Sequence, residues 1–288
     1  MEAIINREVA RELVRYQLIR CRELGGKLQK EAAAELGVRQ PHYAQFEIGG
    51  GPNQRRPDQQ QLATLLTFFG MEDRLPILSQ VLDIARSGTP GGKYGIGMIS
   101  DLDLYLGLEH FATSLTVYEP LLIHGLLQTR DYARVLVEHV AATTPELDAD
   151  TALELRMKRQ LQLRRTPTPL QLTAYIEERA LSTTIGDPQI MRAQLQHLLD
   201  QGRRRNITIR ILPETNALRP TGSRPLALLR FTNQWRMVYA ETPVSAHYYD
   251  APATIEHCAT IMGGLQHLAL DAADSRRLID AAVTQVGA

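Results

Sequence analysis

A glycine-rich break at residues 87–97, SGTPGGKYGIG, separates two parts of the sequence with different patterns. Before it, apolar residues recur at helical spacing, as in Val9, Leu13, Tyr16 and Ile19. After it, short apolar runs bounded by Pro, Gly or Asn alternate with helical segments. Because such a break interrupts regular structure, we expect two domains. The predicted organisation is a first domain at 1–87, a linker at 88–97 and a second domain at 98–288.

The fold class follows from these two patterns. The first domain is predicted to be mainly α-helical, with five helices: one ending near Gly25, then 28–36, 40–47, 58–69 and 72–86. The second is predicted to be an α+β domain with an antiparallel or mixed sheet. Its expected strands are at 114–120, 170–176, 206–212, 225–231 and 236–241. Its expected helices are near 130–140, 148–165, 187–201, 252–270 and 274–286.

Composition narrows the class of protein. The 288 residues are 44% hydrophobic and carry 32 basic and 32 acidic side chains, which excludes a chain that is basic throughout. The two cysteines, Cys21 and Cys258, are too far apart in the sequence for a local metal motif, and their small number argues against a disulfide framework. No apolar run is long enough for a membrane span, and the start does not resemble a signal peptide. We therefore expect a cytoplasmic protein with no membrane partner.

The most specific segment is RCRELGGKLQKEAAAELGVRQPHYAQFEIGG, at residues 20–50. Ala33 is small enough for two helices to approach closely. Gly37, between Leu36 and Val38, suits a tight turn that needs a positive φ. Tyr43 and Phe46 give the following helix an apolar face. This order of helix, turn and helix is what a helix-turn-helix requires.

The spacing resembles the XRE family of repressor-like regulators over about 65 residues. The family pattern has Gln at the start of its second helix, Ala four residues later, then Leu-Gly-Val and a closing Glu-x-Gly. Here these places are held by Gln29, Ala33, residues 36–38 and residues 47–49. The resemblance implies a regulator that binds a double-stranded DNA operator, as a homodimer because one reading helix covers only a half-site.

The resemblance also implies a set of DNA-binding residues. Three polar residues of the third helix would face base edges: Gln40, His42 and Gln45. Four others would contact phosphates: Gln29 at a helix start, and Arg39, Arg55 and Arg56.

The sequence departs from the family at three places. Arg39 replaces a small capping residue, Pro41 enters the first turn of the third helix, and Gln45 replaces a basic residue. The net charge over residues 7–56 is only +4. The alternative is a helical module that has lost DNA binding and serves packing or protein interaction, as in an antitoxin-like protein.

The second domain resembles a C-terminal domain of unknown function found in actinobacterial XRE regulators of the WhiJ-like type. The shared phrases are Tyr-Glu-Pro at 118–120, Gly-Leu-Leu-Gln-Thr at 125–129 and Asp-Tyr-Ala-Arg at 131–134. His124 stands where Pro is usual. A predominance of Arg over Lys agrees with a high-GC source. By resemblance, a small partner protein or a small-molecule effector is expected.

Further matches to this domain lie later in the chain, and residues of the early and later matches, together with the lone tryptophan, are candidates for a ligand or partner pocket. They are Glu119, His124, Gln128, Tyr132, Arg156, Arg159, Glu178, Trp235, Tyr239 and Glu241. The alternative is that they form helix caps and ion pairs around the sheet.

Catalytic motifs are absent from the sequence: there is no G-x-S-x-G, H-E-x-x-H or C-x-x-C. Gly88 to Lys93 only superficially resembles a phosphate loop, since Tyr94 replaces its Ser or Thr. We predict no catalytic residue, no metal and no cofactor. The alternative function is a motif-poor biosynthetic enzyme, a cyclase or isomerase derived from a regulator.

Overall fold

A computed structural model of the chain describes residues 5–49, 55–87, 101–144, 147–215, 219–222, 224–242 and 245–286. The predicted linker at 88–97 lies outside these residues. The chain divides into an N-terminal unit, Met1–Phe111 with Thr232–Trp235, and a C-terminal unit, Ala112–Phe231 with Arg236–Ala288. No helix in the described ranges is long and apolar enough to cross a membrane.

The N-terminal unit is helical, as expected. Its elements are α1 (Arg7–Leu24), α2 (Gln29–Glu35), α3 (Gln40–Glu47), α4 (Gln59–Phe69), the 3-10 turn η1 (Glu72–Arg74), α5 (Leu75–Ser87) and α6 (Asp101–Phe111). The predicted ranges lie within about three residues of α1 to α5. The sequence did not indicate α6, so the expected count of five helices is not confirmed.

Capping and apolar packing define these helices. The Asn6 side chain accepts a hydrogen bond from the Val9 amide and starts α1. Asp58 starts α4 in a capping box with Gln61. Gly70 ends α4 with φ +72°, in the left-handed conformation. The core between α1, α4 and α5 consists of fully buried side chains, among them Leu13, Leu18, Leu62, Leu65 and Leu82.

The C-terminal unit is built on a six-stranded mixed sheet, which agrees with the α+β expectation. The strands are β1 (Ser114–Glu119), β2 (Gln171–Glu177), β3 (Ile207–Leu212), β4 (Leu226–Arg230), β5 (Arg236–Thr242) and β6 (Ser245–Tyr249). Their order is β3-β2-β1-β4-β5-β6. The first three are parallel and the remaining pairs are antiparallel. The sequence did not indicate β6.

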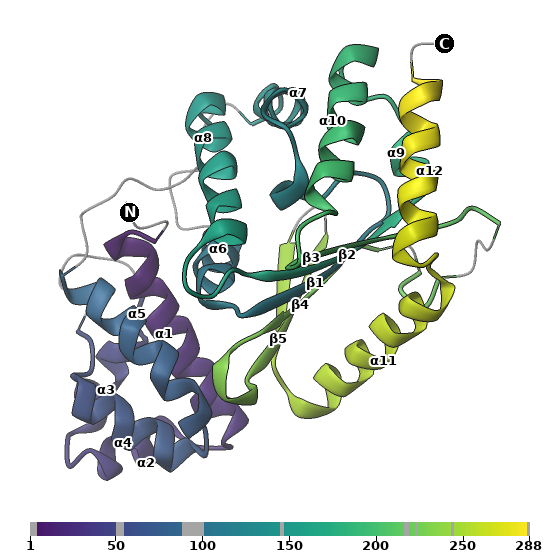
Figure 1. Ribbon diagram of the computed structural model, residues 1–288. Coiled ribbons are helices and arrows are strands. Elements are labelled where there is room, and N and C mark those ends of the chain that lie inside the picture. Colours follow the sequence, from purple (N-terminus) through teal and green to yellow (C-terminus); the bar gives the residue numbers. More distant parts are fainter. Residues whose placement is uncertain are drawn as a thin grey trace. The chain divides into compact units, whose positions relative to one another are not determined.

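Helices and 3-10 turns connect and cover the sheet. They are η2 (Gly125–Leu127), α7 (Arg130–Ala141), α8 (Ala149–Arg159), η3 (Gln160–Arg164), α9 (Arg179–Ser182), α10 (Pro188–Gln201), α11 (Pro252–Leu268) and α12 (Ala272–Gln285). The 3-10 turn η4 (Thr232–Gln234), between β4 and β5 in the sequence, belongs to the N-terminal unit. Within this unit, α8 and α10 lie on one side of the sheet and α11 lies on the other (Figure 1).

At the carboxyl end of β1, the neighbouring residues Tyr118 and Glu119 point to opposite faces of the sheet. Tyr118 points toward α11 and joins a core with Leu228, Val238 and Met262. Glu119, the next residue, therefore points to the opposite face of the sheet, toward α8.

A buried ion pair lies at the carboxyl end of β2, on the face of the sheet that α11 covers. The Arg219 guanidinium donates to both carboxylate oxygens of Glu177, over 2.5 and 2.7 Å. The Tyr118 hydroxyl donates to the same carboxylate over 2.6 Å. Both charged side chains are at most 6% exposed. Because Arg219 lies in the segment after β3, the ion pair fixes this segment to the end of β2. Arg219 also donates to the Pro213 carbonyl over 3.0 Å, which links two parts of the same segment.

Glu177→Gln should lower the free energy of unfolding of the C-terminal unit by roughly 3 kcal/mol, because it leaves a buried guanidinium without its counter-charge. Denaturant unfolding followed by far-UV circular dichroism measures the change. The control is Asp200→Asn, which removes an exposed pair with Arg203 at 3.8 Å and should change stability by less than about 0.5 kcal/mol. Equal effects of the two variants would refute this role of Glu177.

Candidate functional site

The connection between α2 and α3 is built as the sequence indicated. Glu31 accepts a hydrogen bond from the Leu28 amide over 2.7 Å and starts α2. Gly37 has φ +66°, which confirms the expected positive-φ turn residue. The Val38 amide then donates to the Ala33 carbonyl over 3.0 Å, and the Ala33 side chain is only 2% exposed. The turn thereby sets the direction in which α3 leaves α2.

One side of α3 is buried and the other is exposed. Tyr43, Phe46 and Glu47 are buried against the unit. Arg39, Gln40 and Gln45 are exposed. Pro41 lies in the first turn, where its missing N–H removes no helical hydrogen bond. The helix therefore presents polar side chains on a face that its own unit does not cover.

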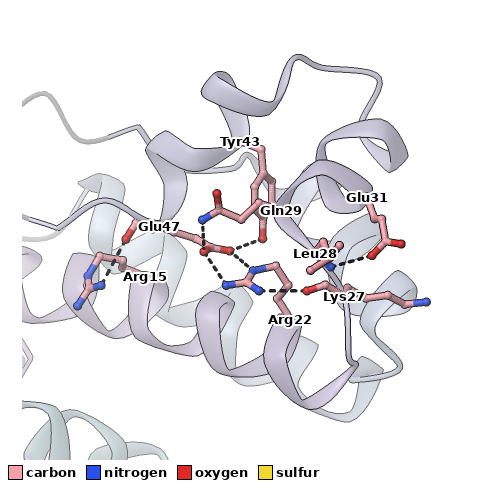
Figure 2. A network of polar contacts seen from close by, with 8 residues as sticks. All are labelled: Arg15, Arg22, Lys27, Leu28, Gln29, Glu31, Tyr43 and Glu47. Carbon is pink, nitrogen blue, oxygen red and sulfur yellow. Dashed lines mark hydrogen bonds and ion pairs between the residues drawn. The ribbon is translucent and has the colours of Figure 1, made fainter.

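Glu47 fixes the buried side of α3 to α1 and α2 (Figure 2). Its carboxylate accepts hydrogen bonds from Arg22 of α1 over 2.6 and 3.0 Å. It accepts another from the Tyr43 hydroxyl over 2.6 Å and one from the Gln29 amide over 2.8 Å. Four donors on a carboxylate that is 5% exposed satisfy its hydrogen-bonding capacity.

This network sets the ionisation of its members. Burial alone would raise the pKa of Glu47, but the hydrogen bonds from Arg22, Tyr43 and Gln29 outweigh it and leave the pKa below its usual value. Burial and the Glu47 carboxylate raise the pKa of Tyr43, so its hydroxyl remains a donor. For Gln29, which is expected to contact phosphate, the structure shows that its amide nitrogen ties the start of α2 to the end of α3.

A second contact explains the glycine of the Glu-x-Gly phrase. Arg15 of α1 donates to the Glu47 carbonyl over 3.3 Å. A Cβ at Gly49 would lie 3.2 Å from the Arg15 Nε. The chain leaving α3 thus passes so close to α1 that a side chain at this place would require the Arg15 side chain to shift slightly.

Beside α3 lies a hollow of about 270 Å³ lined by arginines. Its lining residues are His42, Phe46, Arg55, Arg56, Gln61 and Arg86. His42 packs edge-on against Phe46 at 5.8 Å, and its Nε2 is 3.3 Å from an Arg55 nitrogen. His42, expected at base edges, therefore lies against Arg55 at this hollow.

The charges around the hollow repel one another. Burial lowers the pKa of Arg56, and the nearby Arg11, Arg86 and Arg7 lower it further. Arginines held this close together create a positive potential, and a bound anion would reduce the repulsion between them. Arg7, Arg11 and Arg86 were not singled out from the sequence, because they come from the ends of α1 and α5.

The C-terminal unit contains a separate polar cluster at the carboxyl ends of β1 and β5. We call Glu119, Glu241, Arg156, Arg159 and His124 the Glu119 cluster. The Nε2 of His124 lies 4.0 Å from a Glu119 oxygen. Burial and the nearby Glu241 raise the pKa of Glu119 to about 8, which Arg159 partly opposes. Burial and Arg159 lower the pKa of Arg156 to about 10, which Glu241 partly opposes.

Hydrogen bonds fix the segment that carries His124. Gln128 donates to the Ile123 carbonyl over 2.6 Å and accepts from Arg156 over 2.9 Å. The Ile123 amide donates to the Tyr132 hydroxyl over 3.3 Å. Gln160 donates to the carbonyls of Gly125 and Gln128 over 3.1 and 2.7 Å.

Two of the expected pocket residues, Glu178 and Trp235, lie away from the cluster, and a third, Tyr239, lies beside it. Glu178 accepts a hydrogen bond from the Glu214 amide over 2.8 Å and lines a hollow between α9 and α12. Trp235 belongs to the N-terminal unit, where the Arg74 guanidinium lies 5.2 Å from its ring. Tyr239 is buried on the Glu241 side of β5 and contacts the Tyr248 ring at 5.3 Å. We therefore leave Glu178 and Trp235 out of the cluster.

Residues that complete these sites were missed because their partners are distant in the sequence. Arg22 and Gln194 were not named as site residues, because they act through contacts to other elements; Gln194, for example, bridges the Thr129 amide and the Leu127 carbonyl. Among the described residues, no group of three or more His, Cys, Asp and Glu is placed to hold a metal ion.

Comparison with known families identifies the larger part of the chain. A family model described as a domain of unknown function, DUF5753, matches residues 102–281. The chain belongs to this family. The DUF5753 match includes every residue of the Glu119 cluster and supports the expected C-terminal domain of unknown function. No curated protein and no solved structure matches the chain.

Glu47→Gln should lower the stability of the N-terminal unit by roughly 3 kcal/mol, because Arg22 and Tyr43 lose a charged acceptor. Since the folded pKa of Glu47 is depressed, its contribution is present above pH 4.5 and is lost as the pH falls through the folded pKa. Hydrogen exchange of α3 amides measures the loss. The control is Glu35→Gln, an exposed carboxylate on α2, which should leave α3 protection unchanged.

Glu119→Gln should stabilise the DUF5753 domain at alkaline pH. The folded pKa of Glu119 is raised from 4.5 to about 8, so its favourable contribution is present below 4.5 and is lost as the pH rises through 8. Above pH 8 the neutral amide should add roughly 2 kcal/mol to the free energy of unfolding. Urea titrations at several pH values measure it. Glu138→Gln, an exposed control, should follow the wild-type pH dependence, and an identical curve for Glu119→Gln would contradict the assignment.

Proposed function

We propose that the chain is a sequence-specific DNA-binding transcription regulator, with a helix-turn-helix in the N-terminal unit and a sensing domain of the DUF5753 family. In this proposal α3 is the reading helix. The observation that carries it is the exposed polar face of α3, with Gln40 and Gln45, beside the arginine-lined hollow at Arg55 and Arg56.

The two parts of this surface suit different parts of DNA. Glutamine amides can form paired hydrogen bonds with adenine in the major groove. DNA phosphates would reduce the repulsion between the arginines. Such phosphate contacts position the protein on DNA without selecting a base sequence. The Glu47 network supports reading by α3, because it holds the helix rigidly from its buried side. Gln29 is assigned to this positioning role.

The C-terminal unit is proposed to sense a small effector or a partner protein and to change the affinity for DNA. Its support is the Glu119 cluster, where the Glu119 carboxyl lies 4.0 Å from the His124 ring and where burial and the nearby Glu241 raise its pKa to about 8. We further propose a homodimer in the cytoplasm, because one reading helix covers a single half-site and dimers read two. No cofactor or catalytic residue is needed for this function.

A salt-dependent DNA titration tests the regulator. Fluorescence anisotropy of the full chain with DNA from upstream of its own gene should show affinity that falls steeply with rising salt. Gln40→Ala should weaken binding to that DNA roughly tenfold and leave binding to unrelated DNA unchanged. Arg55→Ala should weaken both and reduce the salt slope by about one.

The matched control is Gln80→Ala, an exposed glutamine on α5, which should bind both DNAs as the wild type does. Absence of binding at low salt to the upstream DNA and to genomic fragments would overturn the proposal. In that case the N-terminal unit would act in protein interaction.

A further inference from the structure

We propose that the arginine-lined hollow beside α3 binds a free anion with a doubly charged phosphate group, inorganic phosphate or a phosphate monoester, and that this anion competes with DNA. The inference deepens the proposed function. Its competition part rests on DNA reading by the N-terminal unit, whereas the anion site does not. The described lining residues of the hollow all belong to that unit and come from α3, the connection before α4, α4 and α5.

The three arginines of the hollow come from two segments that are distant in the sequence. Arg86, near the end of α5, donates to the Pro57 carbonyl over 3.4 Å, which brings its guanidinium beside the residue that follows Arg56. A terminal nitrogen of Arg55 lies 3.3 Å from the His42 Nε2. Arg55, Arg56 and Arg86 line the same hollow of about 270 Å³. Three guanidiniums thus border one concave surface.

Arg56 is the arginine that most needs an acceptor. Among the described residues it makes no hydrogen bond and no ion pair, and its Nη1 is buried. A buried donor without an acceptor lowers stability. Burial and the neighbouring arginines also lower the pKa of Arg56. An oxyanion in the hollow would give this guanidinium an acceptor and reduce the repulsion on it.

Two further residues of the lining have donors available. The side-chain oxygen of Gln61 accepts from the Asp58 amide over 2.9 Å as part of the α4 cap. Its amide nitrogen makes no hydrogen bond among the described residues and remains a donor at the hollow. Arg86 uses one terminal nitrogen for the Pro57 carbonyl, so most of its five N–H groups remain available.

The positive charge of the hollow has no counter-charge in its lining. None of the described lining residues is acidic. Glu8 of α1 pairs with Arg7 and Arg11 over 3.4 and 3.9 Å. Asp58 accepts from a backbone amide of α4 over 2.7 Å and caps that helix. The three guanidiniums of the lining therefore await an external anion.

The number of charges indicates which phosphate fits. A DNA phosphodiester carries one negative charge, and two of its four oxygens are esterified. A phosphate monoester carries about 1.5 to 2 negative charges at pH 7 and offers three terminal oxygens as acceptors. Against three guanidiniums, the doubly charged group compensates more charge and can accept from each of them.

The depth of the hollow also favours a small free anion. Arg55 is exposed, so a phosphate of duplex DNA can reach it. Arg56 is only partly exposed, and a small anion can enter a recess that a duplex cannot. Because Arg55 borders the hollow, an anion bound there would neutralise a proposed DNA contact. Bound anion should therefore weaken DNA binding.

Isothermal titration calorimetry of the full chain with inorganic phosphate tests the site, with sodium chloride adjusted to keep the ionic strength constant. Phosphate should bind saturably. Arg56→Gln and Arg86→Gln should each weaken its binding roughly tenfold or more, because each removes a charged donor. Dimethyl phosphate, a singly charged diester like the DNA backbone, should bind at least roughly tenfold more weakly than phosphate.

The matched control is Arg203→Gln, which removes the same charge from an exposed position of the C-terminal unit. It should bind phosphate as the wild type does. Circular dichroism verifies that each variant is folded, and Arg86 is exposed, so its replacement is expected to leave the fold intact. The site is overturned if phosphate does not bind saturably, if dimethyl phosphate binds equally well, or if both hollow variants bind phosphate unchanged.

Fluorescence anisotropy with the upstream DNA tests the competition, again at constant ionic strength. DNA affinity of the wild type should fall as phosphate rises above its dissociation constant, and the affinity of Arg86→Gln should respond much less. Equal responses of the two proteins would contradict competition at the hollow.

Two results distinguish this inference from the proposed function. Phosphate binding by a chain that binds no DNA overturns the regulator and supports the anion site. Salt-dependent DNA binding by a chain that binds no phosphate overturns the anion site and leaves DNA reading standing. Gln40→Ala should lose specific DNA binding and keep the phosphate affinity of the wild type, since Gln40 does not line the hollow.

Discussion

The Glu47 carboxylate is the point on which the arrangement of α1, α2 and α3 depends. Arg22, Gln29 and Tyr43 bring donors from all three helices to it, within 2.6–3.0 Å. An apolar contact in this place would tolerate sliding of one helix over another, since it has no directional preference. Several hydrogen bonds to one carboxylate fix both distance and orientation. The network therefore determines which residues of α3 remain exposed.

The C-terminal unit depends on a different constraint, the strict alternation of side chains along a strand. Tyr118 and Glu119 are adjacent in β1 yet belong to opposite faces. Tyr118 enters the core beneath α11 and bonds Glu177. Glu119 joins Glu241 because β5 runs parallel to β1, with β4 between them, so that their carboxyl ends reach the same edge. The strand order thus creates the Glu119 cluster.

Most of the regular structure could be predicted from local sequence, and the exceptions have physical reasons. Strands β1 to β5 are bounded by Pro, Gly or Asn and are rich in apolar residues. The helix α6, DLDLYLGLEHF, was missed because Leu104, Leu106 and Leu108 alternate as in a strand and are all buried. Such a helix has no polar stripe that reveals its period. The short β6, SAHYY, lies at the edge of the described sheet beside β5 and contains none of the Val, Ile or Leu residues that mark the other strands.

The sites were predicted less completely, because pairing across long distances decides them. The phrase Gln-x-x-x-Ala and the closing Glu-x-Gly located α2 and α3 but gave no indication that Gln29 and Glu47 bond each other. Similarly, the sequence indicated Glu119, His124 and Arg156 as pocket candidates together with Glu178 and Trp235, and nothing in it distinguished the two groups. In the structure, Trp235 belongs to the N-terminal unit and Glu178 bonds the Glu214 amide, whereas Glu119 and His124 lie together at the carboxyl end of β1.

Two glutamates at the carboxyl ends of neighbouring strands, Glu177 and Glu119, differ in how their carboxyl groups are paired. Glu177 receives two bonds from Arg219 and one from Tyr118, so its charge is fully used inside the unit. Glu119 is equally part of a strand end, but it faces a second carboxylate and a histidine at 4.0 Å. Holding an underpaired carboxylate near another costs stability, as its raised pKa indicates. At Glu177 two hydrogen bonds from Arg219 compensate the buried charge, whereas Glu119 has no such arginine hydrogen bond among the described residues. A buried carboxyl whose pKa is raised by a second acid is more often found at functional sites than in purely structural ion pairs, which is why the sensing role is proposed for the Glu119 cluster and not for the Glu177 pair.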